Sequence, residues 1–140
     1  MRSLRLVLLA GLVCLLPATL AAAETGQEEP FTALEAHTAA TSASQSSAAV
    51  YALLINVETD DRLVGAESDV CERVDLVDAD DHVLAYTELT LQEDVITVLG
   101  DEPFHLRLTG LRRPLVAGET VTVTLVFEHS GRIPLPTAVN

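Results

Sequence analysis

Residues 104–131, FHLRLTGLRRPLVAGETVTVTLVFEHSG, contain the clearest strand pattern in the chain. From residue 120 to residue 128, apolar side chains alternate with threonines and a glutamate, and only Val126 interrupts the polar side. Period-two alternation of β-branched residues is typical of a strand with one buried face. The Ala-Gly-Glu segment at 117–119 predicts the turn that precedes this strand.

The same alternation occurs at the beginning of this stretch. Phe104, Leu106 and Leu108 alternate with His105 and Arg107. Because successive side chains of a strand point to opposite faces, His105 and Arg107 are expected on one face and the three apolar residues on the other.

The remainder of the chain also has the pattern of short strands separated by turns. The candidate strands are residues 49–57, 62–66, 70–77, 82–91, 94–99 and 133–139, with residues 82–91 and 94–99 expected to form a hairpin-like pair. Acidic turns lie between several of them, and no segment after the N-terminal region has helical periodicity. The pattern predicts an all-β protein, an antiparallel β-sandwich.

Two segments are expected at the edges of the sheets. Residues 133–139 contain Pro134 and Pro136, which lack a backbone N–H, so this segment is expected to be an edge strand or a tail. Residues 24–47 are polar and then rich in Ala, Ser and Thr, which indicates a linker, with residues 31–37 as a candidate edge strand. The folded domain is therefore placed at residues 48–140.

Ordered blocks of this chain resemble the PCuAC family of periplasmic copper chaperones. The blocks are Asp-Arg-Leu-Val-Gly-Ala at 61–66, Glu-Arg-Val-Asp-Leu at 72–76, Phe-His-Leu-Arg-Leu-Thr-Gly-Leu at 104–111 and Arg-Pro-Leu through Phe-Glu at 113–128. The resemblance implies a cupredoxin- or immunoglobulin-like sandwich and an exported protein that binds or delivers copper. It also implies a copper-accepting partner, either an exported or a membrane protein.

The copper ligands that the resemblance implies are mostly missing. That family holds copper with a His-x-Met pair, a later Met and a final His-x-Met pair, and thioether and imidazole groups suit Cu(I). The corresponding positions here are Val77, a position near Tyr86, and then His105 followed by Arg107. Met1 is the only methionine. A Met-based Cu(I) site is therefore expected to be lost, and His105 is the strongest remaining metal candidate, the alternative being an exposed strand histidine.

Other side chains are weaker metal candidates. Cys71 offers a thiolate for Cu(I), although it lies six residues from Val77, roughly 20 Å along a straight strand, and a buried inert thiol is the alternative. His82 stands beside two aspartates in the acidic turn 78–81, where a solvated turn is the alternative to a Cu(II) or hard-metal site. His37 and His129 are interpreted as surface residues. The acidic turns Asp60-Asp61 and 78–81 could attract Ca²⁺, but they lack the ligand spacing and the glycine of an EF-hand loop, so solvated turns are expected.

The N-terminal region has the pattern of a secretory signal peptide. Arg2 and Arg5 precede an apolar run at 6–16, and three alanines end at Ala23, after which cleavage is expected. Export to the periplasm or secretion is the predicted localisation. A lipoprotein signal would use Cys14, but the bulky Val13 precedes it.

Composition limits the classes of partner. Removing the two signal arginines leaves 6 basic and 21 acidic side chains, a net charge of −15, and lysine is absent. This charge and the aromatic content of 4% argue against nucleic-acid binding. The acidic surface is interpreted either as solvated, as in high-salt proteins, or as attracting cations.

No enzyme motif is present, neither a nucleophile elbow, a zinc-protease helix nor a phosphate-binding glycine loop, so the protein is not expected to be an enzyme. A secreted enzyme of unrecognised type is a third hypothesis that nothing in the sequence motivates, so two functions remain. One is an exported copper-chaperone-like protein. The other is an exported binding or structural β-sandwich domain that has kept the scaffold without the metal.

Overall fold

The computed structural model describes residues 31–56 and 59–140. Its strands are β1 (Phe31–Thr38), β2 (Ser47–Asn56), β3 (Asp61–Ser68), β4 (Cys71–Asp78), β5 (Val83–Leu84), β6 (Thr90–Leu91), β7 (Ile96–Leu99), β8 (Phe104–Leu111), β9 (Thr120–Phe127) and β10 (Gly131–Val139). A 3₁₀ turn, η1 (Tyr86–Glu88), lies between β5 and β6. The predicted all-β class is confirmed. Among these residues no helix has the length and apolar character needed to cross a membrane.

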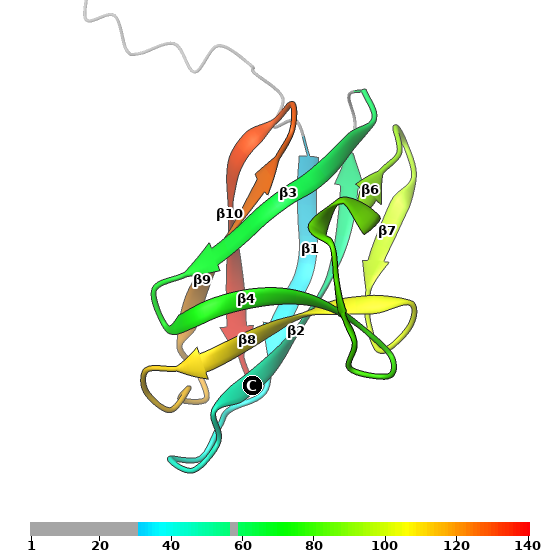
Figure 1. Cartoon of the computed structure of the whole chain (residues 1–140). Coiled ribbons are helices and arrows are strands. Elements are labelled where there is room, and N and C mark those ends of the chain that lie inside the picture. The colour runs from blue at the N-terminus through cyan, green and yellow to red at the C-terminus, as the bar shows by residue number, and fades with distance from the viewer. Residues whose placement is uncertain (1–30, 57–58) are drawn as a thin grey trace, which may run out of the picture.

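The strands form one curled sheet that encloses its own core (Figure 1). The strand order is β5-β4-β8-β2-β1-β10-β9-β3-β6, with β7 paired to β2 beside β8. Neighbouring strands are antiparallel except β1 and β10, which are parallel. Buried side chains from both halves of this order form a single cluster, so the two halves pack as the layers of a sandwich.

The period-two pattern accounts for this core. In β9, Val121, Val123, Leu125 and Phe127 are buried while the threonines between them are exposed or half-buried. β8 contributes its buried leucines from the opposite layer. Full burial of each such side chain stabilises the fold by about 1.5–3 kcal/mol, so the core does not need a disulfide.

Both segments expected at an edge lie inside the sheet order. β1 has β2 on one side and β10 on the other, and β10 lies between β1 and β9. The edge prediction for residues 133–139 is wrong, because β10 pairs with β9 on one side and with β1 on the other. The contact with β1 is confined to the end of the strand, at Ala138 and Val139. Pro134 and Pro136 precede that contact, so their missing N–H groups leave no bond to β1 unmade.

The expected hairpin of residues 82–91 and 94–99 is absent. The short strands of this region pair with three different partners: β5 with β4, β6 with β3, and β7 with β2. The apolar residues that suggested one long strand are divided among these contacts, and Leu89 and Leu91 enter the core.

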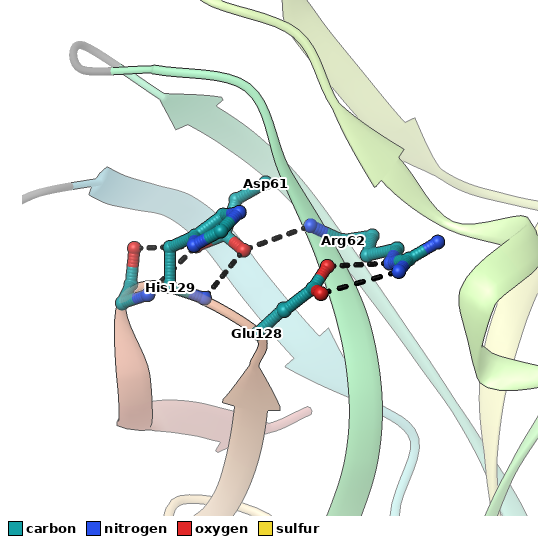
Figure 2. Close-up of polar contacts among 5 residues, drawn as sticks. Asp61, Arg62, Glu128 and His129 are labelled. Atoms are coloured by element: carbon teal, nitrogen blue, oxygen red, sulfur yellow. Dashed lines mark hydrogen bonds and ion pairs between the residues drawn. The ribbon is translucent and has the colours of Figure 1, made fainter.

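Asp61 is not part of a solvated acidic turn, as its neighbours had suggested. Its side chain is buried, and its carboxylate accepts the backbone N–H groups of Arg62, His129 and Ser130 at 2.8–2.9 Å and the Ser130 hydroxyl at 2.7 Å. Figure 2 shows this carboxylate directed at the turn after β9, beside the ion pair between Arg62 and Glu128. Asp61 therefore fixes the β9–β10 turn to β3.

Candidate functional site

The strand register assembles a row of four side chains on the outer face of the sheet. Val77 in β4 pairs with His105 in β8, and His37 in β1 pairs with Tyr51 in β2. The pairing of Val50 with Leu106 places Tyr51 next to His105. The ring centroids lie 5.4 Å apart for Tyr51 and His105 and 5.6 Å apart for His37 and Tyr51.

His105 lies on the outer face as predicted, but it is not an exposed histidine. Only 8% of its surface is accessible, because Tyr51 and the neighbouring strands cover it. Its Nδ1 atom is buried and has no hydrogen-bond partner among the described residues. A buried polar atom without a partner costs about 1–3 kcal/mol, so this nitrogen is a point in the site where the fold leaves a polar group unpaired.

A hollow of about 320 Å³ opens beside His105. Its polar lining comes from Thr41, Gln45 and Ser47 on the β1–β2 side and from Asp81 and Arg107 on the other. Arg107 shares this hollow with His105, which confirms that the two side chains lie on one face. Its Nη1 atom is 3.8 Å from the Asp81 Oδ1 atom, so the guanidinium charge beside His105 is partly balanced.

Tyr51 and His37 extend the site, and the sequence did not identify Tyr51 as a site residue. The Tyr51 hydroxyl donates to the Asp101 carboxylate at 2.9 Å, and this bond together with burial raises the pKa of Tyr51. The His37 Nδ1 atom lies 2.7 Å from the Glu35 carbonyl oxygen. A carbonyl only accepts, so Nδ1 carries the proton and Nε2 of the neutral ring keeps its lone pair. Metal-binding histidines commonly have this arrangement.

The turn between β4 and β5 gathers Asp78, Asp80 and His82 so that one ligand atom of each lies within 4.8 Å of the others. Asp78 accepts the backbone N–H groups of Asp80 and His82 at 2.9 Å, and its Oδ2 atom is 3.3 Å from the His82 Nδ1 atom. These bonds outweigh desolvation and lower the pKa of Asp78. Asp80 and His82 are exposed, Asp78 is half-buried, and the contacts among them are those of a closed turn, so the metal role of His82 stays a prediction.

Cys71 begins β4 and is 1% exposed, within the core. Burial raises the pKa of its thiol, which leaves little reactive thiolate. In the register Cys71 pairs with Leu111, whereas Val77 pairs with His105, so the thiol lies at the other end of β4 from His105. His129 lines a separate small hollow with Asp60, Arg62, Thr90 and Glu128. Neither residue is brought to the His105 site.

The sequence could identify His105 and Arg107 because both lie on one strand. It could not identify Tyr51 or Asp101, whose place in the site depends on which strands pair. The sequence did contain one indication for Tyr51: the alternation in residues 49–57 places it on the opposite face from its two neighbours in the strand.

Comparisons with known proteins give a family from the sequence and a fold from solved structures. The sequence profile of the family described as "LpqE-like: Putative lipoprotein LpqE-like" matches residues 32–139. No curated protein matches the chain.

Solved structures that resemble it include PCuAC domains. The copper-bound PCuAC domain from PmoF2 is 21% identical with a TM-score of 0.67, covering 79% of this chain and 92% of that one. The apo PCuAC domain from PmoF1 is 20% identical with a TM-score of 0.68, covering 79% and 93%. CuI-DR1885 from Deinococcus radiodurans is 26% identical with a TM-score of 0.64, covering 78% and 76%.

Proposed function

Because the chain belongs to the LpqE-like family and shares the fold of PCuAC copper chaperone domains, we propose that it is an exported copper-handling domain that binds copper at His105. Copper is the cargo in this proposal, carried on the outer face of the sheet. The protein passes it to a copper-accepting exported or membrane protein.

The observation that carries the proposal is that His105, whose buried Nδ1 atom has no partner among the described residues, lines a hollow of about 320 Å³. The register adds support, since Val77 and His105 are cross-strand neighbours. These are the two positions at which the resemblance to PCuAC proteins implies histidines. The scaffold therefore holds the remaining histidine where a two-strand metal site is geometrically possible.

The donor set favours a different copper state from that of a Met-based site. Met1 is the only methionine, and Arg107 stands where the last methionine is implied. The donor atoms around the hollow beside His105 are nitrogen and oxygen atoms, from its own imidazole ring, the Tyr51 hydroxyl and the Asp81 carboxylate. Such donors suit Cu(II) better than Cu(I). We therefore propose that the Met-based Cu(I) site is lost and that Cu(II) binds more tightly.

A second function is favoured by Val77 and Arg107. One removes a ligand and the other places a positive charge beside His105, and both changes weaken a cation site. The alternative is an exported, non-enzymatic binding or structural domain that kept only the scaffold.

Titration of residues 24–140 with Cu(II), and with Cu(I) in competition with a chelator, tests the choice. Stoichiometric binding that is lost in His105→Ala and retained in His129→Ala supports the copper proposal. Loss in Cys71→Ser or His82→Ala, with His105→Ala unaffected, would place copper elsewhere. Absence of binding in the parent chain would favour the scaffold alternative.

Export is proposed from residues 1–23, which lie outside the described residues. The family description names a lipoprotein, which brings Cys14 back as a second candidate start of the mature chain. Mass spectrometry of the exported protein separates the two, since cleavage after Ala23 leaves an unmodified N-terminal Glu24, whereas lipidation leaves an acylated Cys14.

A further inference from the structure

An apolar surface continues from the His105 site along the same outer face. We define the apolar face as Leu34, Leu53, Ile55, Ile96 and Val98. Cross-strand pairing joins Leu53 to Leu34 and to Val98, and Ile55 to Ile96, so the five side chains are neighbours on β1, β2 and β7. Ile96 is 56% exposed and Val98 47% exposed. Contiguous exposed apolar side chains of this kind mark interaction sites.

β7 also has an edge without a strand partner in the described part of the chain. It pairs with β2 and with no other strand, and Figure 1 shows it at the right-hand margin of the molecule. The strand contains neither proline nor lysine, the residues that commonly block such edges. An open edge of this type accepts an extended segment through backbone hydrogen bonds.

Acidic side chains bound this edge at both ends. Glu93 and Asp94 precede β7, Asp101 and Glu102 follow it, and all four are exposed. No Lys or Arg occurs in the sequence between Arg73 and Arg107. Pairing of β7 with β7 of a second copy would place acidic pairs against acidic pairs in either strand direction, which is repulsive. The charge pattern therefore disfavours self-pairing and favours a basic partner.

We propose that the edge of β7 and the apolar face dock a partner protein that contributes a short apolar strand flanked by Arg or Lys residues. Backbone bonds to β7 supply pairing, the apolar face receives alternate side chains, and the two acidic pairs select the basic flanks. That this partner exchanges copper with His105 is a further step, and it rests on the proposed function.

The structure connects this surface to the site through Asp101. Its carboxylate belongs to the acidic pair after β7 and also accepts the Tyr51 hydroxyl at 2.9 Å. The Tyr51 ring in turn lies 5.4 Å from His105 between ring centroids. A basic group that binds Asp101 is thus placed two contacts away from His105.

The test uses a defined probe, the peptide Arg-Arg-Val-Thr-Ile-Thr-Val-Arg-Arg, titrated into ¹⁵N-labelled residues 24–140. A peptide with the same centre and Glu flanks is the control ligand. The expected result is saturable shifts of backbone resonances in β7 and β2, weakened by salt, with no saturation by the Glu-flanked peptide. Ile96→Asp with Val98→Asp should weaken binding at least about tenfold, whereas Val116→Asp, which alters an equally exposed valine outside the apolar face, should not.

A second variant, Glu93→Gln with Glu102→Gln, changes charge alone and should weaken the basic peptide about threefold or more. The proposal is overturned by the absence of binding, by equal binding of both peptides, or by affinity that the β7 variants leave unchanged. Sedimentation showing a dimer that Ile96→Asp with Val98→Asp dissociates would assign the face to a second copy and also overturn it. Copper titration of the same variants reports separately on the proposed function.

Discussion

His105 stands out at the residue scale because burial and an unpaired ring nitrogen coincide there. We predict that His105→Phe raises the free energy of unfolding by about 1 kcal/mol, since the ring still packs on Tyr51 and the orphan polar atom is removed. Urea denaturation measures the change.

His37→Phe is the matched control for that substitution. It removes the bond from Nδ1 to the Glu35 carbonyl and should lower the free energy of unfolding by about 0.5–1.5 kcal/mol. If His105→Phe destabilises the protein as much as His37→Phe does, the unpaired nitrogen is not a stability defect.

Asp61 supports a prediction about pH. Desolvation raises the pKa of Asp61, but the bonds from Ser130, His129 and Arg62 outweigh it and lower the pKa overall. A carboxyl whose folded pKa lies below the unfolded value of about 3.9 adds stability above that pH and loses it as pH falls through the folded pKa. Unfolding free energy should therefore fall below about pH 4 in the parent chain and less steeply in Asp61→Asn.

At neutral pH Asp61→Asn should cost about 1–3 kcal/mol, because the amide cannot accept all the bonds that the carboxylate accepts. Asp80→Asn, in an exposed turn, is the control and should change little. Parallel pH curves for the parent and Asp61→Asn would exclude a lowered pKa at this residue.

For individual residues, the sequence predicted positions that depend on a single strand and missed contacts that depend on the pairing of two strands. His105 and Arg107 follow from alternation within β8. The alternative of an exposed histidine at 105 is wrong, because the pairing of β2 with β8 brings the ring of Tyr51 against it. Asp61 was read as solvated since its partners, His129 and Ser130, lie far away in the sequence.

At the scale of elements, β1 sets the N-terminal limit of the segment that we expect to fold. It pairs with both β2 and β10, and Thr38 is fully buried with its hydroxyl donating to the Ala49 carbonyl at 2.7 Å. We predict that a chain of residues 48–140 is unfolded, whereas a chain of residues 24–140 is folded. Far-UV circular dichroism and amide resonance dispersion measure this, and cooperative unfolding of the shorter chain would contradict it.

Strand type was predictable from alternation, but strand neighbours were not. A proline shows only that one backbone N–H is missing at that position. In β10 both prolines precede the residues that pair with β1, so the strand still has a neighbour on each side. Between residues 82 and 99 the short apolar runs carry no information about partner, so a hairpin was expected where three separate pairings occur.

Net charge acts at the scale of the whole molecule. The chain carries 21 acidic and 8 basic side chains, so self-repulsion opposes the folded state. The Debye length, over which salt screens a charge, falls from about 30 Å at 0.01 M salt to about 3 Å at 1 M. We predict that the free energy of unfolding of residues 24–140 rises with NaCl, by on the order of 1 kcal/mol.

Urea denaturation at several NaCl concentrations measures this slope. Glu93→Gln with Glu102→Gln reduces the acidic excess and should flatten it. A stability that is constant or falls with salt would mean that the acidic groups lie too far apart to repel one another appreciably.

The buried thiol of Cys71 can serve as a chemical probe for opening of the sheet. The chain of residues 24–140 contains one cysteine, 1% exposed at the end of β4 remote from His105. A thiol-alkylating reagent can reach it only when the core around the start of β4 opens, so each modified molecule records one opening event. The rate of alkylation, measured by mass spectrometry, would then give the rate at which the sheet opens. A ligand that holds β8 in place would lower that rate.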